Sequence, residues 1–191
     1  MLDQAVSSWL LRSRPKDGAR LRLFCFPYAG GAAVAYRGWS DHLPGGVEVC
    51  PVQLPGRGNR FREPAFERID ALVRAAADGL APHFDRPFAF FGHSMGALVA
   101  FELARELRRR GQALPFGLFV SAHEAPHRPA PLPPITHLGD AEFVDEVRRR
   151  YGGIPEEVLA EPELLELMLP VLRSDITALE GHRHSPEAPL G

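Results

Sequence analysis

Two kinds of hydrophobic pattern alternate along this chain: continuous apolar runs, and apolar residues at helical spacing. Nearly continuous apolar runs, which are typical of strands buried on both faces of a sheet, occupy residues 21–26, 47–53, 88–91 and 115–122. Between them, apolar residues recur at helical spacing in residues 32–43, 66–84 and 97–110. Because strands and helices alternate, we expect an α/β fold, with a mostly parallel sheet and helices on both of its faces.

The alternation ends after residue 122. Residues 125–134 contain five prolines, too many for a helix or a strand, so we expect a loop or hinge there. Residues 140–151 have the pattern of a helix, with Asp140 as its expected N-cap and Gly152 as its stop.

A second helix is expected over residues 162–179, and Pro170 should kink or split it because proline lacks an N–H and clashes with the preceding turn. This segment has more apolar residues than one core-facing stripe requires. We therefore expect a helical lid with an apolar underside over one edge of the sheet, with an ordinary pair of core helices as the alternative. The expected division of the single domain is a core at 1–122, a lid insertion at 123–182 and a return to the core at 183–191.

Composition narrows the functional classes. The 191 residues include 22 Lys and Arg against 24 Asp and Glu and are 45% hydrophobic, which describes an ordinary globular protein without the basic excess of a nucleic-acid binder. No apolar run approaches the ~20 residues of a membrane span, and residues 1–14 make a poor secretory signal. Cys25 and Cys50 lie in apolar runs and are interpreted as buried, reduced thiols, with a disulfide as the alternative. We expect a cytoplasmic protein.

The candidate chemistry centres on Gly92-His93-Ser94-Met95-Gly96, a G-x-S-x-G pattern between an expected strand and an expected helix. A sharp turn at this junction would hold the hydroxyl of Ser94 clear of the sheet, and the glycines would let backbones approach closely. The first amides of the helix would stabilise an oxyanion. We interpret Ser94 as a nucleophile; a strand–helix turn without chemistry is the alternative.

An oxyanion hole needs two N–H donors. Met95 follows the nucleophile and is expected to supply one, and Ala29 in the turn Tyr28-Ala29-Gly30-Gly31 is expected to supply the other. A plain glycine turn is the alternative for this segment. Both segments follow strands, so they should meet at the carboxyl edge of the sheet, where ligands bind in such folds.

An activated serine also needs a base and an acid that orients it. His93 should point away from the serine, and His123 has no acid at a suitable place before it. Asp175 with His182 or His184 has the right order but lies in a helical segment. We therefore expect the rest of the catalytic relay to lie outside this chain.

Two arginines, Arg57 and Arg60, lie in a turn near the same edge. They would bind a phosphate or a carrier surface, or, as is more common for loop arginines, form ion pairs that order the loop. The sequence has no Cys/His metal cluster, no G-x-G-x-x-G and no P-loop.

Three separated motifs carry a family resemblance: Phe26-Pro27-Tyr28-Ala29-Gly30-Gly31, Gln53-Leu54-Pro55-Gly56-Arg57 and Gly92-His93-Ser94-Met95-Gly96-Ala97. Together they resemble the type II thioesterases of polyketide and non-ribosomal peptide assembly lines, and residues 151–155 through 173–175 resemble the lid of that family. The resemblance implies an α/β-hydrolase fold and an editing role, in which acyl thioesters are hydrolysed from the phosphopantetheine arm of an acyl or peptidyl carrier protein. It implies Ser94 as nucleophile and the amides of Ala29 and Met95 as oxyanion hole. We expect no metal and no cofactor, since the substrate is carried on the phosphopantetheine of a carrier protein.

The chain departs from this family pattern at its end. Members continue past residues 188–191 into another strand with the triad Asp, then a helix and a loop with the His. We therefore expect the last strand–helix units to be missing, an edge strand to be exposed, and residues 1–191 to be nearly inactive alone. The alternatives to a thioesterase are a small-ester or lipase-like serine hydrolase, and a catalytically dead module that binds a carrier.

Overall fold

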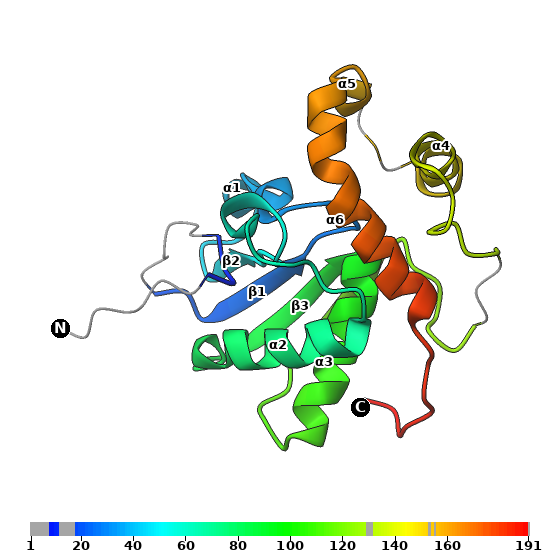
Figure 1. Ribbon diagram of the computed structural model, residues 1–191. Coiled ribbons are helices and arrows are strands. Elements are labelled where there is room, and N and C mark those ends of the chain that lie inside the picture. The colour runs from blue at the N-terminus through cyan, green and yellow to red at the C-terminus, as the bar shows by residue number, and fades with distance from the viewer. Residues whose placement is uncertain (1–7, 12–17, 129–131, 153, 155, 191) are drawn as a thin grey trace.

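The computed structural model describes residues 8–11, 18–128, 132–152, 154 and 156–190, and places a four-stranded sheet at the centre of the chain (Figure 1). Predictions that concern residues 1–7, 12–14, 129–131, 153 and 155 lie outside the described residues. The strands are β1 (Leu21–Phe26), β2 (Val47–Pro51), β3 (Phe88–His93) and β4 (Leu118–Ser121), in the order β2-β1-β3-β4. Every pairing between them is parallel, which confirms the expected parallel sheet.

Two strands are shorter than their apolar runs. The run 47–53 leaves the sheet after Pro51, and Val52 forms an isolated antiparallel bridge with Leu10. The run 115–122 contributes only Leu118–Ser121. Hydrophobicity alone therefore overestimated the length of both strands, because an apolar run does not mark where the paired strand ends.

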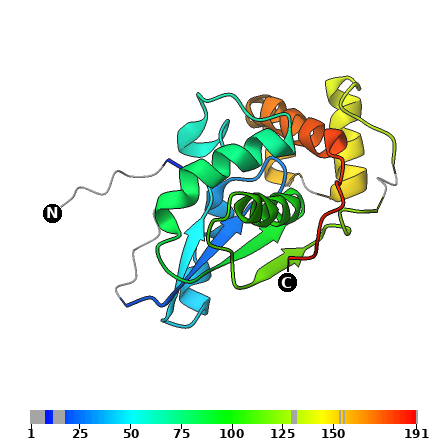
Figure 2. The same cartoon turned by 90° about the horizontal axis from the view of Figure 1, so that it is seen from below.

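One face of the sheet is covered by α2 (Ile69–Leu80) and α3 (Met95–Arg109), which lie side by side (Figures 1 and 2). Their apolar stripes bury phenylalanines of β1 and β3, and Phe24 and Phe90 meet edge to face with ring centroids 6.0 Å apart. The expected helix over 66–84 begins at Ile69 because Arg68 is extended, and its end tightens into the short 3₁₀ helix η3 (Ala81–His83).

The opposite face has a smaller cover, made by the 3₁₀ helix η1 (Ala33–Tyr36) and α1 (Trp39–His42). Trp39 packs on Phe91 with centroids 4.9 Å apart. The single helix expected over 32–43 is wrong: it is divided in two. Arg37 is extended and ends the first half, and Gly38, with a left-handed φ of +86°, precedes the second.

After β4 the chain forms three helices at the carboxyl edge of the sheet, α4 (Asp140–Tyr151), α5 (Glu156–Leu159) and α6 (Pro162–Gly181). They share a second apolar cluster around Phe143 and Ile176. The residue that caps α4 is Gly139, so the expected cap Asp140 is instead the first helical residue, while Gly152 ends α4 at φ +60° as expected. Helix α6 continues through Pro170 as one helix, and α5 was not expected.

The strand β4 forms one edge of the sheet. Phe119 and Val120 on this strand are 55% and 57% exposed, which agrees with the expected exposed edge. Within the described part of the chain, no helix is both long and apolar enough to cross a bilayer.

Candidate active site

Ser94 lies on a strained turn between β3 and α3. Its φ of +52° and ψ of −121° are unusual for a residue with a side chain and carry a strain of order 1–3 kcal/mol. Two backbone hydrogen bonds hold the turn: the N–H of Ser94 donates to the carbonyl of Ser121 over 2.8 Å, and the N–H of Ala97 donates to the carbonyl of Ser94 over 2.9 Å. Strain retained in this way at a strand–helix junction is characteristic of a nucleophile elbow.

Glycine is required on both sides of this turn. A Cβ on Gly92 would lie 2.1 Å from the carbonyl oxygen of Gly96, and a Cβ on Gly96 would lie 2.0 Å from the carbonyl oxygen of Phe26. The start of α3 therefore packs backbone to backbone on β1. This contact places Met95, the first residue of α3, directly beside the segment that leaves β1, and its N–H is among the first-turn amides without an acceptor inside the helix.

The segment that leaves β1 is a tight turn. The N–H of Gly31 donates to the carbonyl of Tyr28 over 2.8 Å, and Gly30 has a φ of +72°, as the third residue of a type II turn requires. Ala29 is the second residue of this turn. It contacts both the core cluster of the sheet and the cluster of α4–α6.

A cavity of ≈ 330 Å³ opens beside Ser94. Its lower wall comes from the sheet edge and its upper wall from α4 and α6; the lining residues are Tyr28, Ala29, His93, Ser94, Val147, Tyr151, Gly152, Leu172, Ile176 and Leu179. The structure thus brings Ala29 and Ser94 to one cavity whose other wall is mostly apolar. Leu172 lines it, but Met168 does not and instead packs in the cluster of α4–α6.

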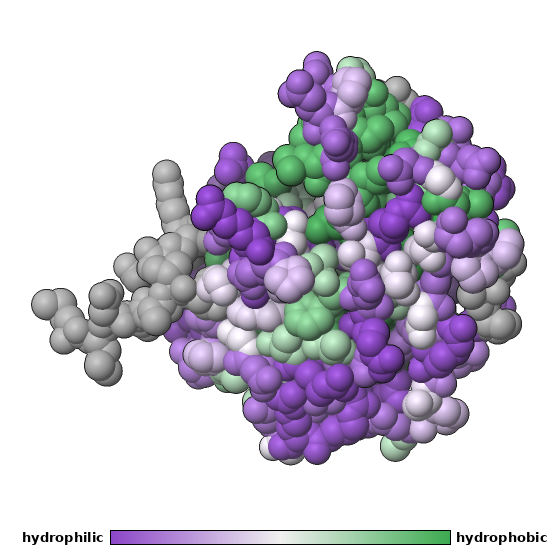
Figure 3. All heavy atoms as spheres, in the orientation of Figure 1, coloured by the Kyte–Doolittle hydropathy of each residue, from purple (hydrophilic) through white to green (hydrophobic). Residues whose placement is uncertain are grey.

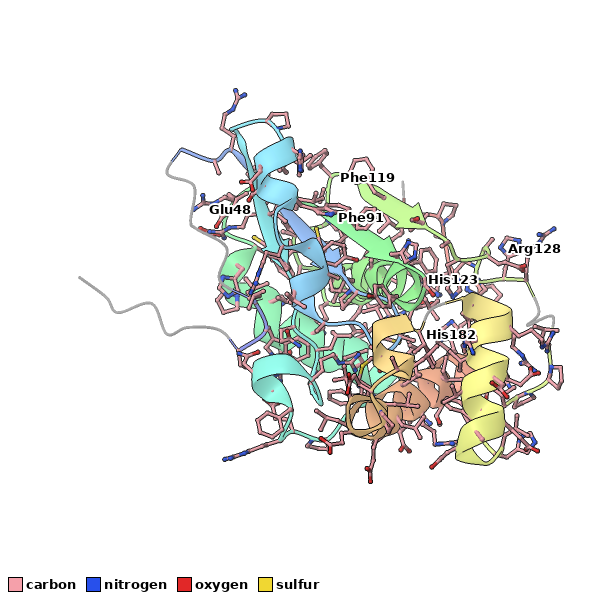
Figure 4. All side chains as sticks on the ribbon, turned by 90° about the horizontal axis from the view of Figure 1, so that it is seen from above. Glu48, Phe91, Phe119, His123, Arg128 and His182 are labelled. Carbon is pink, nitrogen blue, oxygen red and sulfur yellow. The ribbon has the colours of Figure 1, made fainter. Side chains whose placement is uncertain are left out.

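No histidine among the described residues hydrogen bonds to the hydroxyl of Ser94. His93 points to the hydroxyl of Ser121, with 3.1 Å between Nδ1 and Oγ, and its ring packs edge to face on Tyr28. The Nδ1 atom of His123 lies 2.7 Å from the carbonyl oxygen of Glu124. Figure 4 shows His123 and His182 on neighbouring segments, after β4 and after α6.

His182 is half-buried beside Glu102, with its Nε2 atom out of solvent and 3.6 Å from a carboxylate oxygen. Burial lowers the pKa of His182, and Arg105 and His184 act in the same direction, while Glu102 raises it. Asp175 does not pair with His182 or His184, because it faces Arg57 instead.

The two loop arginines form ion pairs. Arg57 makes a bidentate pair with Asp175, with N–O distances of 2.6 and 2.8 Å. Arg60 pairs with Glu63 at 2.6 and 2.8 Å and stacks over Trp9, with its guanidinium carbon 4.3 Å from the ring centroid. Both arginines are buried, so the interpretation as loop-ordering residues fits them.

The link between Asp175 and the turn after β1 was missed by sequence reasoning. The N–H of Gly30 donates to Asp175 over 2.7 Å, although 145 residues separate them. Gln53 organises the neighbouring turn, because its amide donates to the carbonyl of Arg57 over 3.1 Å and accepts from the N–H of Ala33 over 3.3 Å. The sequence signal that could have pointed to the role of Asp175 is its charge within an otherwise apolar stripe of α6.

Two further observations concern the cysteines and the possible metal ligands. Cys25 and Cys50 are buried free thiols, and burial raises the pKa of both, that of Cys50 to about 12, so neither is an activated nucleophile. Over the described ranges, no group of three or more His, Cys, Asp or Glu residues is arranged to hold a metal ion.

Comparisons with known proteins point to one family. The thioesterase domain family matches residues 21–190. Linear gramicidin dehydrogenase LgrE of Brevibacillus parabrevis is 48% identical over 188 residues, which are 97% of this chain and 71% of LgrE. Among solved structures, the RedJ thioesterase of the prodiginine pathway of Streptomyces coelicolor is 42% identical with a TM-score of 0.82, covering 94% of this chain and 68% of RedJ. The type II thioesterase BorB of the borrelidin cluster is 38% identical with a TM-score of 0.82, covering 94% of this chain and 73% of BorB.

Proposed function

Because this chain belongs to the thioesterase domain family of α/β-hydrolase fold, we propose that Ser94 is the nucleophile that hydrolyses acyl thioesters, with the amides of Ala29 and Met95 as its oxyanion hole. The observation that carries this proposal is the strained elbow of Ser94 in the same cavity as Ala29. The substrate is an acyl group held on the phosphopantetheine arm of a carrier protein, and its removal clears stalled or wrongly loaded carriers in the cytoplasm. RedJ and BorB, which belong to biosynthetic pathways of this kind, support the assignment.

The reaction proceeds in two steps. The Ser94 oxygen attacks the thioester carbonyl carbon, a base takes the hydroxyl proton, and the carbonyl oxygen becomes an oxyanion held by the two N–H donors. The C–S bond breaks, and the thiol of phosphopantetheine leaves with a proton. Water then attacks the acyl-serine ester by the same route, which releases a carboxylic acid and restores Ser94.

The helices α4 to α6 form the lid in this proposal. Val147, Leu172 and Ile176 offer an apolar wall to the acyl chain. Figure 3 shows hydrophobic surface at the top of the molecule, where α5 and the first half of α6 lie. Leu164 and Leu167 there are 40% and 72% exposed, and we place the approach of the carrier at this end.

No described histidine hydrogen bonds to the hydroxyl of Ser94, so none of them is assigned as the base. His93 and His123 are engaged elsewhere, and His182 faces Glu102. We therefore propose that the acid and the base of the relay come from residues outside this chain of 191. Without a base the serine hydroxyl is weakly nucleophilic, and loss of a triad histidine lowers turnover by on the order of 10⁶-fold.

The test uses a fluorophosphonate reagent and an acyl-carrier thioester. We expect the protein expressed from its complete reading frame to be labelled at Ser94 and to hydrolyse the thioester, and Ser94→Ala to do neither. Residues 1–191 alone should be nearly inactive. Persistent labelling of Ser94→Ala would refute the nucleophile, and equal rates for the two chain lengths would place the base within residues 1–191.

The same assay separates the alternatives. A small-ester hydrolase would prefer a free ester over the acyl carrier, and a carrier-binding module would bind the carrier without turnover in the complete protein. The dehydrogenase activity in the name of LgrE is not carried over, because the turn after β1, Pro27-Tyr28-Ala29-Gly30-Gly31, lacks the G-x-G-x-x-G pattern of a dinucleotide site.

A further inference from the structure

Asp175 on α6 is the partner of the turn that contains Ala29. Its carboxylate accepts the N–H of Gly30 over 2.7 Å and the two guanidinium nitrogens of Arg57 over 2.6 and 2.8 Å. Arg57 in turn donates to the carbonyl of Gly31 over 3.2 Å. Both charged side chains are almost fully buried, with 3% of Asp175 and 6% of Arg57 exposed. A buried carboxylate is therefore aimed at one peptide of the proposed oxyanion turn.

Helix α6 also packs directly on the two glycine turns at this edge. A Cβ on Gly30 would lie 3.2 Å from a methyl carbon of Leu172, and a Cβ on Gly56 would lie 2.8 Å from a methyl carbon of Val171. The ion pair is thus one of several contacts that fix this part of α6 against β1 and β2.

The two halves of α6 differ sharply on either side of Pro170. The buried residues of the helix are Val171, Leu172, Asp175, Ile176 and Ala178, all of which follow that proline. The described residues of the first half are exposed or only partly buried. Proline removes a helical hydrogen bond, which makes this the weakest point of the helix. The second half is therefore the part of the α4–α6 lid that is fixed against the sheet.

From these contacts we propose that Asp175 is a positioning residue, which fixes the peptide between Ala29 and Gly30 and so aims the N–H of Ala29 at the oxyanion. The inference rests on the proposed function of Ser94. Asp175 holds the peptide that follows Ala29, and the hydrogen bond from Gly31 to Tyr28 closes the turn around it. The peptide before Ala29, which carries the N–H of Ala29, is therefore restrained within the same closed turn. Arg57 neutralises the carboxylate, whose negative charge beside the turn would otherwise oppose an oxyanion bound there.

A single substitution would not test this role, because it would leave the partner as an unpaired buried charge and unfold the site. Two double variants avoid that. Arg57→Met/Asp175→Asn removes the ion pair but keeps a side-chain oxygen for Gly30, and the freed carbonyl of Gly31 can accept the new amide N–H. Arg57→Met/Asp175→Leu removes the ion pair and the acceptor together. The two variants lack the same ion pair and differ in the polar groups that residue 175 offers to the turn, above all the acceptor for the N–H of Gly30.

Each protein, expressed from its complete reading frame, is compared for kcat, KM and hydrogen exchange of the Gly30 amide. We expect the Leu variant to lose about 10- to 100-fold in kcat, as for a displaced oxyanion donor, with KM within about twofold of the parent. Its Gly30 amide should exchange at least about tenfold faster. The Asn variant should retain most of the kcat and the slow exchange.

Equal kcat in the two variants would overturn the positioning role, and so would a Leu variant whose Gly30 exchanges fast while kcat is unchanged. The rate at which a fluorophosphonate labels Ser94 ranks the variants without any thioester, because its phosphoryl oxygen also occupies an oxyanion hole. Absence of thioester turnover in the parent would refute the proposed function, while the labelling ranks would still decide the role of Asp175.

Discussion

Gly96→Ala is the substitution for which the structure gives the sharpest expectation. The added methyl carbon would lie 2.0 Å from the carbonyl oxygen of Phe26 and 2.8 Å from that of Pro27. Cβ atoms essentially never approach another heavy atom closer than 3.0 Å, so α3 must move about 1 Å away from β1. Both partners are backbone, and no side-chain rotation can relieve the clash.

The loss of folding stability in Gly96→Ala can be estimated from packing. Overpacking a well-filled core costs about 1–3 kcal/mol, and we take ~3 kcal/mol because rigid backbone lies on both sides. The better helix propensity of alanine offsets about 1 kcal/mol. A net loss of ~2 kcal/mol corresponds to a fall in Tm of roughly 4–8 °C for a domain of this size. Displacing Ser94 and Met95 from Ala29 by ~1 Å should also reduce activity by about 100-fold.

The assay is thermal unfolding followed by circular dichroism, with fluorophosphonate labelling of the same samples. Gly181→Ala is the matched control, since no heavy atom lies within 4 Å of its added Cβ and it ends α6. We expect this control to keep its Tm or to gain slightly. A Gly96→Ala protein with the Tm and labelling rate of the control would refute the close approach of α3 and β1.

Two further predictions concern the cavity and pH. Leu172→Asn should alter the preferred acyl length because Leu172 lines the cavity, whereas Met168→Gln should lower Tm and leave the preferred length unchanged. The measurement is turnover of carriers loaded with acyl chains of increasing length. A changed preference in Met168→Gln but not in Leu172→Asn would contradict this placement. Burial lowers the pKa of His182 below its ordinary value of 6.5, so between the two pKa values the unfolded chain binds more protons than the folded protein. The contribution of His182 to stability is therefore present above pH 6.5 and is lost as the pH falls through the folded pKa. Thermal melts across pH 5 to 8 should show a smaller acid loss for His182→Gln; an equal loss would mean that His182 does not titrate differently on folding.

The sequence by itself determined the order of elements and the elbow. Continuous apolar runs and helical patterns depend on neighbours along the chain, so the parallel strands and the helices α2 and α3 could be predicted from residues alone. The motif around Ser94 could be predicted for the same reason, since strand, glycine turn and helix are consecutive. Boundaries failed where local backbone geometry decided them, as at Gly38, which divides the expected helix after β1, and at Gly139, which caps α4 in place of Asp140.

Only the tertiary structure decided what holds the site together. The carboxylate of Asp175 reaches Gly30 and Arg57 from 145 and 118 residues away, and no local period carries such a pairing. The ion pair of Asp175 with Arg57 could not be predicted from the sequence, because His182 and His184 are nearer to Asp175 along the chain. The packing of α6 decides it, since it directs Asp175 to the turns after β1 and β2. The tertiary structure also decided which residues line the cavity. Leu172 and Met168 lie on the same helix, but Leu172 packs against Gly30 in the turn after β1 and lines the cavity, whereas Met168 does not.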